Sequence, residues 1–149
     1  MVKLFQIEEP DGSPVDADMP GAAIGIDAAG RAAEVAVAVG GNPAALADRD
    51  GWPLDLAVPV PSAPDEAWRH LFEGARLRAE RALARPVSHA VLVAQPMPDA
   101  EIARLHAAAD AAGIALLRIV AAGEIAAGEN RACAAAILAE ELMPRPEAP

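Results

Sequence analysis

A strand–helix–strand unit over residues 86–120 constrains the fold of this chain more than any other feature of its sequence. The apolar run HAVLVA leads into the proline-containing turn QPMP, and Asp99 then stands where it would cap a helix. Gly113 is typical of a helix end, and the apolar run IALLRIV follows it directly. A helical crossover is the connection that two parallel strands require, so the sequence predicts an α/β core.

The composition is that of one globular domain with a core of small side chains. The chain has 149 residues, of which 54% are hydrophobic but only 3% are aromatic. This length and this apolar fraction suit a single domain with a full core, and they exclude an intrinsically disordered chain. The net charge of −10 argues against nucleic-acid binding, which requires lysine and arginine clustered against phosphates.

The chain contains one cysteine, and its first residues do not have the pattern of a signal peptide. Cys133 is the only cysteine, so an internal disulfide is excluded, and its alanine-rich surroundings favour a buried, unreactive thiol. The opening MVKLFQIEEPDG lacks the apolar stretch of a signal peptide, and no run of the chain has the length of a membrane helix. We therefore expect a cytoplasmic protein that makes no contact with a membrane.

The N-terminal half of the chain is predicted to be an arm followed by a meander of strands. Residues 1–22 begin with the alternating run VKLFQI, which predicts a short edge strand, and continue as a polar, turn-rich arm. Residues 54–60 are predicted to add an extended segment that their prolines restrict to a sheet edge. Between these segments, the period of the apolar residues predicts strands at 23–27, 33–39 and 44–48.

Three helices are predicted. Ser62 and Asp65 have the spacing of a capping box at the start of the first, and its apolar residues form a single helical stripe. Glycine and asparagine are expected to split the third helix, at Gly123, Gly128 and Asn130. The predicted helical ranges are 63–85, 99–112 and 122–142.

The order of these elements is that of the ribonuclease H-like fold, which the actin-like ATPases share. Three antiparallel strands are followed by a helix, a strand, a helix, a strand and a final helix. We therefore expect an α/β domain over residues 23–142, with a mixed five-stranded sheet and about three helices. The tail at 143–149 contains three prolines, cannot continue a helix, and is expected to be disordered.

Three segments, in order along the chain, resemble the seventy-kilodalton heat-shock chaperones, the DnaK family. AIGIDAAGRAAEVAVAV is similar to the opening hairpin of that family, with its I-G-I-D-x-G-T-T signature. ARPVSHAVLVAQP is similar to the strand G-K-P-V-x-x-A-V-I-T-V-P, and DAEIARLHAAADAAGIALLRI resembles the capped helix and strand that follow it. The resemblance covers residues 23–142, nearly the whole chain.

The resemblance implies a single subdomain, the inner half of the first lobe of an actin-like ATPase. The small outer subdomain of that lobe would be inserted where residues 54–64 form a direct bridge. The second lobe and the peptide-binding domain have no counterpart. In the family this subdomain buries apolar surface against its neighbours, so that surface needs another cover here. The N-terminal arm, a second copy of the chain and a separate protein are the alternatives.

The resemblance also implies which residues occupy the family's phosphate and metal site. Asp27 stands where the family's aspartate helps to hold the water shell of the metal–phosphate complex. Ala29, Gly30 and Arg31 replace a Gly-Thr-Thr that contacts phosphates, so the hydroxyl groups are lost. The family's catalytic lysine has no counterpart, because Lys3 is the only lysine. Phosphoryl transfer needs metal, water and cation together, so we interpret the site as vestigial.

The proline-rich connections favour a shallow cleft at one edge of the sheet. Gln95 and Met97 follow a strand at its carboxyl end, the edge where binding sites form in open α/β sheets. Asp27 and the turn at 28–31 are expected to open on the same edge. We therefore predict that one cleft is lined by Asp27, Arg31, Gln95 and Met97.

A ribonuclease H-like nuclease is an alternative on the same fold, and it would hold two metal ions with converging carboxylates. Asp27 would be the first ligand, but Gln95 stands where the second acid is expected, which leaves Glu124 or Glu129 as further ligands. The histidines lack the spacing of a metal site, and no metal is expected. They are His70, His89 and His106.

We therefore expect a degenerate chaperone-like protein that acts through protein contacts, as a regulator or an assembly factor, and does not hydrolyse ATP on its own. Its partner would be another protein or a second copy of the chain, with no nucleic acid. No cofactor is expected, although weak binding of Mg-ATP is compatible with the resemblance. The alternatives are half of a split ATP-binding chaperone, whose second lobe is encoded separately, and the nuclease.

Overall fold

The computed structural model describes residues 6–7, 22–46, 57–60 and 63–143. The strands in these ranges are β1 (Gln6–Ile7), β2 (Ala22–Asp27), β3 (Glu34–Val39), β4 (Asn42–Leu46), β5 (Val87–Ala94) and β6 (Ala115–Ala121). The α-helices are α1 (Asp65–Leu83), α2 (Asp99–Ala111) and α3 (Arg131–Leu142), and the short 3₁₀ helix η1 (Ala122–Glu124) follows β6.

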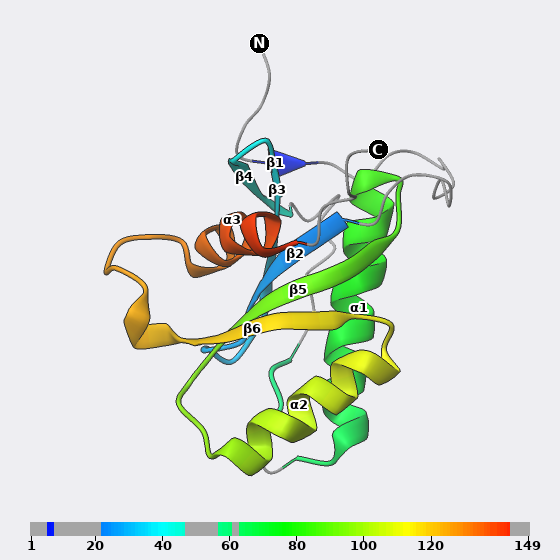
Figure 1. Cartoon of the computed structure of the whole chain (residues 1–149), viewed down its shortest axis with the longest axis vertical. Coiled ribbons are helices and arrows are strands. Elements are labelled where there is room, and N and C mark those ends of the chain that lie inside the picture. Colours follow the sequence, from blue (N-terminus) through cyan, green and yellow to red (C-terminus); the bar gives the residue numbers. More distant parts are fainter. Residues whose placement is uncertain (1–5, 8–21, 47–56, 61–62, 144–149) are drawn as a thin grey trace, which may run out of the picture.

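The strands form one mixed sheet in the order β1-β4-β3-β2-β5-β6 (Figure 1). β2, β3 and β4 make an antiparallel meander, whereas β5 runs parallel to β2 and β6 runs parallel to β5. Without β1, this is the three-two-one-four-five order of a ribonuclease H-like fold. The predicted α/β class, with five core strands and three helices, is therefore confirmed. β1 lies at the outer side of β4 and pairs with it in parallel, so the predicted edge strand is also present.

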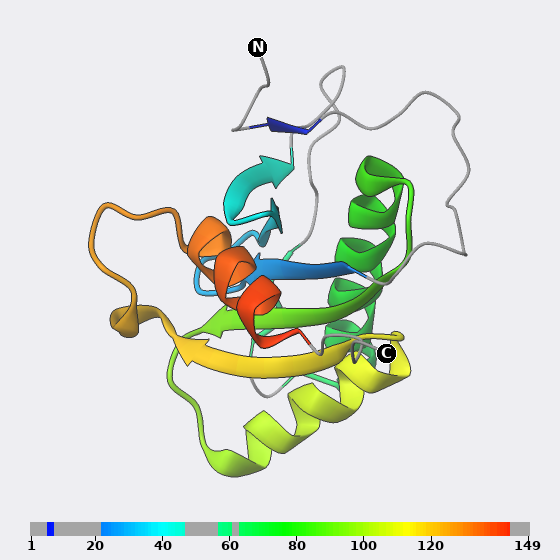
Figure 2. The same cartoon turned by 45° about the horizontal axis from the view of Figure 1, so that its top comes forward.

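The two faces of the sheet are covered by different helices. α1 and α2 lie on one side, and α3 lies on the other (Figures 1 and 2). Successive residues of a strand point to opposite faces, so β5 contributes to both cores. Leu92 packs with α1 and α2, whereas Val91 and Val93 pack with α3. We call these the α1/α2 face and the α3 face.

α1 and α2 each begin one residue after a proline. Pro64 and Pro98 are the cap residues, and proline has no polar side chain with which to cap a helix. The predicted capping roles are therefore wrong, because Asp65 and Asp99 are the first helical residues, and Ser62 lies outside the described residues. The fixed φ of proline orders the chain just before the helix, and an aspartate in the first turn is favoured by the helix dipole.

The predicted helix at 122–142 is confirmed only in its C-terminal half. η1 and a loop occupy 122–130, where Gly128 has a φ of 91° that favours glycine. α3 begins after Asn130, whose side chain accepts a hydrogen bond from the backbone N–H of Cys133 at 2.9 Å. This is the preferred chemistry of an N-cap, so the predicted break at Asn130 is correct. Gly113, with a φ of 85°, follows α2 as predicted.

Other boundaries differ from the prediction at the hairpin and the connections. Gly40 and Gly41 both have positive φ and form a two-residue hairpin turn, so β4 begins at Asn42 and not at residue 44. The predicted extended segment at 54–60 contributes one antiparallel bridge, between Ala57 and Ala32. Residues 54–56 of that segment lie outside the described residues, as do the arm at 8–21, positions 47–48 and the tail at 144–149.

None of the helices in the described ranges combines the length and the apolarity that crossing a bilayer requires.

Candidate functional site

Asp27 is the only charged residue that is buried in the described part of the chain, at 6% exposure. It is the last residue of β2, opposite Glu34 on β3 and Val93 on β5. Because β2 and β5 are parallel, its carboxylate lies at the carboxyl edge of both strands. A carboxylate taken out of water must be paired or hydrogen-bonded, so its partners define what this site can do.

Two internal donors satisfy the Asp27 carboxylate. Oδ1 accepts a hydrogen bond from the backbone N–H of Ala29 at 3.0 Å, which makes an Asx turn. Oδ2 accepts from Nε of Arg131 at 3.0 Å, and this contact is also an ion pair. Arg131 is the first residue of α3, and its side chain is 42% exposed. The guanidinium therefore balances the buried charge from the rim of the site.

Two hydrogen bonds hold the turn that follows β2 against the end of β5. The backbone N–H of Ala28 donates to the carbonyl of Val93 at 2.7 Å, which carries the β2–β5 pairing one residue further. Nε2 of Gln95 donates to the carbonyl of Ala29 at 3.1 Å. Asp27 and Gln95 therefore lie at the same end of the sheet, as the carboxyl-edge argument predicts.

The remaining predicted site residues do not join this network through their side chains. Arg31 is exposed, and its guanidinium makes no hydrogen bond or ion pair within the described ranges, although its carbonyl accepts from the N–H of Val58 at 2.9 Å. Gly30 is exposed and has open space around it. Met97 is half-buried and packs against the core of the α1/α2 face. A cleft shared by the four predicted residues stays a prediction.

The pairing of Asp27 with Arg131 limits which ligands can bind at this edge of the sheet. A guanidinium bonded to Asp27 repels a divalent cation and engages an oxygen that the ion would need. No group of three or more His, Cys, Asp or Glu residues among the described residues could hold a metal ion. Glu124 and Glu129, either of which was a candidate for a further ligand of a nuclease, both line a groove beside β6. The donor set therefore does not fit a metal–phosphate complex.

Arg131 is the residue of this candidate site that sequence reasoning missed. It lies 104 positions from Asp27, so no local pattern links them. One signal was present, because a cation in the first turn of a helix is disfavoured by the helix dipole. Such a residue directly after an N-cap asparagine indicates that an acid lies nearby.

Cys133, two residues further along α3, is half-buried, which corrects the prediction of a fully buried thiol. It lies in the first turn of α3 and packs against buried alanines of β3 and α3. Partial burial, followed by the negative charge of Glu34, raises the pKa of its thiol. The thiolate form is therefore disfavoured, in agreement with the predicted low reactivity.

Comparisons with models of known protein families and with curated protein sequences found no match. The likeness to the DnaK family therefore rests on the three sequence segments described above.

Proposed function

We propose that this chain is a degenerate chaperone-like protein, of the DnaK type, that acts through protein contacts as a regulator or an assembly factor and does not hydrolyse ATP on its own. The observation that carries the proposal is the internal pairing of Asp27, whose two carboxylate oxygens accept from Ala29 and Arg131. In an ATPase of this type, that carboxylate would be directed at the water shell of a metal ion.

The chemistry around Asp27 supports the same reading. Phosphoryl transfer depends on positioned metal ions, a positioned nucleophile and cations that stabilise the charge of the transferred group. The turn after Asp27 supplies Ala29, Gly30 and Arg31, so it has no hydroxyl side chain. The chain has one lysine, Lys3, which lies outside the described residues. One paired aspartate does not replace that set.

Calorimetry and phosphate-release measurements with Mg-ATP test the absence of turnover. We expect no release above the background for the full chain, and no binding in the micromolar range. Arg131→Ala leaves Asp27 without its counter-charge, and we expect no turnover from this variant either, because the hydroxyl groups and the lysine are still missing. Arg131→Lys, which keeps the charge, is the matched control for folding.

Turnover that Asp27→Asn abolishes would refute the proposal and favour the split ATPase. Light scattering coupled to size-exclusion chromatography tests the protein-contact half of the proposal for a second copy of the chain. A stable dimer at micromolar concentration would identify self-association as that contact. A monomer at high concentration would exclude a second copy as the partner and would count against a face that another chain must cover.

A further inference from the structure

The α3 face of the sheet is only partly covered by the described helices. α3 packs chiefly on β2 and β3 and touches β6 least, whereas the opposite face carries both α1 and α2, with α2 against β6 (Figure 2). Among the elements that the structure describes, no second helix therefore lies beside α3 over the outer strand β6, whereas the other face of the sheet has two helices. Layered α/β folds bury each apolar face of the sheet against helices, so this strip is incomplete.

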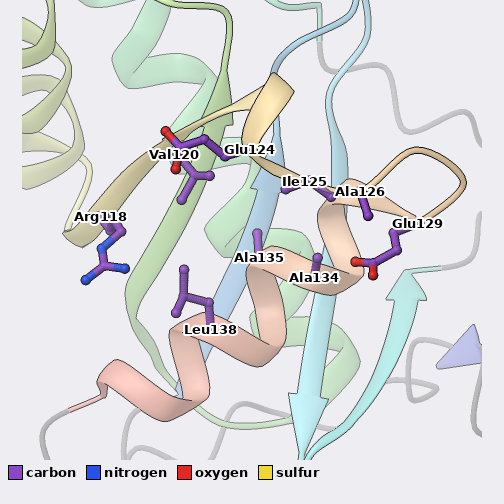
Figure 3. A pocket seen from close by; sticks show the side chains of 9 residues that line it. All are labelled: Arg118, Val120, Glu124, Ile125, Ala126, Glu129, Ala134, Ala135 and Leu138. Atoms are coloured by element: carbon purple, nitrogen blue, oxygen red, sulfur yellow. The ribbon is translucent and has the colours of Figure 1, made fainter.

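A groove of about 410 Å³ lies in this strip, between β6, the loop after it and α3 (Figure 3). Its floor is apolar and includes Val120, Ile125 and Leu138, together with alanines of α3. Ile125 and Leu138 are half-buried and pack against the core of the α3 face. The floor therefore presents apolar surface that is continuous with a hydrophobic core.

The rim of the groove is charged and unpaired. Arg118 lies at one end of the groove and Glu129 at the other, with Glu124 on the loop side (Figure 3). Within the described part of the chain, none of these three side chains forms a hydrogen bond or an ion pair. Charged residues on the other face are paired: Arg104, for example, contacts Glu101 and Asp65. The rim charges are therefore available to a partner.

The outer edge of β6 is protected against the addition of another strand. The register with β5 steps from Ala90–Leu116 to Val91–Arg118, so Leu117 is an extra residue and β6 has a bulge at that point. Bulges and charged side chains are the features by which natural sheet edges avoid new pairing. Arg118 supplies the charge directly after the bulge. An occupant of the groove is therefore favoured as a helix on the sheet face, and not as a strand at its edge.

We propose that this groove docks an amphipathic helix of a partner protein, with basic side chains directed toward Glu124 and Glu129. This docking site rests on the proposed function, in which the chain acts through protein contacts, and the partner would be a protein with a basic amphipathic helix. A helix beside α3 at the usual spacing of roughly 8–10 Å would complete the layer on this face. Its apolar stripe would cover the floor residues, which is the groove mode of helix recognition.

Charge and composition select the occupant. Two of the three rim charges are acidic and the chain carries a net charge of −10, so a basic helix is attracted and a second copy of the chain is repelled. The chain's own tail at 144–149 contains three prolines in six residues, a composition that does not suit an amphipathic helix. A separate, basic protein partner is therefore the occupant that these observations favour.

Three synthetic peptides test the proposal against the full chain, with fluorescence anisotropy for affinity and backbone amide shifts in NMR spectra for the location. Two are helices of about 16 residues, close to the shortest length that forms in isolation, with the same leucine stripe and either lysine or glutamate at the other positions. The third is an extended peptide of valine, threonine and lysine. We expect the lysine helix to bind, with amide shifts confined to β6, the loop at 122–130 and α3.

Two charge reversals with the same change in net charge separate the groove from general attraction. Glu124→Lys combined with Glu129→Lys is expected to weaken the lysine helix by roughly tenfold or more. Asp110→Lys combined with Glu141→Lys, at exposed positions outside the groove lining, is expected to change its affinity by less than about twofold. Leu138→Glu, which places a charge in the floor, is expected to abolish binding; if this variant does not fold, the two reversals decide.

Four results would each overturn the proposal. The two reversals could have equal effects, or the lysine helix could fail to bind. The extended peptide could bind more tightly, or the chain could form a dimer that Leu138→Glu dissociates. None of these results depends on ATP. If the docking site is refuted, the proposed function still stands, because the protein contact would then use another surface. Turnover that depends on Asp27 would instead refute the proposed function itself.

Discussion

The two faces of the sheet are packed in opposite ways. On the α1/α2 face the buried residues include Trp68, Phe72 and Leu105, so side-chain volume fills the space between helix and sheet. On the α3 face every buried residue of α3 is an alanine: Ala132, Ala135, Ala136 and Ala139. Small side chains let α3 lie with its backbone close to β2. One face should therefore be sensitive to the loss of volume, and the other to its addition.

Phe72→Ala should disrupt the packing of the α1/α2 face by removing side-chain volume, and it should have the largest effect on stability. Phe72 is fully buried, so truncation leaves a cavity that the surrounding strands cannot fill. We expect the free energy of unfolding to fall by about 3–5 kcal/mol, measured by urea denaturation. Leu77→Ala, at an exposed position of the same helix, should cost less than about 0.5 kcal/mol. A cost below about 1 kcal/mol for Phe72→Ala would show that volume does not hold this face.

Gly25→Ala should disrupt the packing of the α3 face by adding side-chain volume. A Cβ at Gly25 would overlap backbone atoms of Ala132 and Ala136, which cannot move without shifting α3. We expect a loss of about 1–3 kcal/mol in the free energy of unfolding. Gly30→Ala, where nothing lies within 4 Å of the new atom, is the matched control and should be close to neutral.

The Gly25 prediction has a second, sharper form. Because the clash involves backbone atoms, Ala136→Gly should not rescue Gly25→Ala, and the double variant should be less stable than either single one. Rescue would mean that side chains, and not the backbone, set the distance between α3 and β2.

Glu140→Ala should loosen the link between α3 and the hairpin at the edge of the meander. The two carboxylate oxygens of Glu140 accept from the N–H groups of Gly40 and Gly41, at 2.8 and 2.7 Å. Because these contacts are exposed, we expect a loss of about 1 kcal/mol and faster amide exchange at both glycines. Glu141→Ala, at the exposed next position, should leave their exchange unchanged. Unchanged exchange in Glu140→Ala would mean that the turn is held by its own conformation.

Cys133 reports on the side of α3 that packs toward β3, with the smallest expected effect. Partial burial and the charge of Glu34 raise the pKa of its thiol, so less thiolate is present at neutral pH than for a free cysteine. Labelling by iodoacetamide should be slow at pH 7 and should accelerate as the pH rises through the raised pKa. Glu34→Gln should lower the pKa and shift the rate profile toward lower pH, whereas Glu141→Gln should not. A profile that matches free cysteine would contradict the burial of this residue.

The candidate site could be predicted only in part. The sequence places Asp27 and Gln95 at one edge because Asp27 ends a predicted strand and Gln95 follows one. The partner of Asp27 could not be placed, because Arg131 is brought there by the position of α3 over the sheet. The cap residues of α1 and α2 differ from the prediction for a different reason. A proline before an aspartate leaves two neighbouring residues competing for the cap position, and the side-chain pattern alone favoured the wrong ones.

The sequence by itself determined the order of the elements, the direction of the strands and the break before α3, because these depend on short-range patterns of apolar residues, prolines and caps. It also determined that the turn after Asp27 has no serine or threonine and that Lys3 is the only lysine. Only the tertiary structure decided that Arg131 neutralises Asp27, that Gly25 lies against the backbone of α3, and that α3 leaves a charged groove beside β6. These features depend on where one helix lies on the sheet, and that position is set by packing between residues about a hundred positions apart.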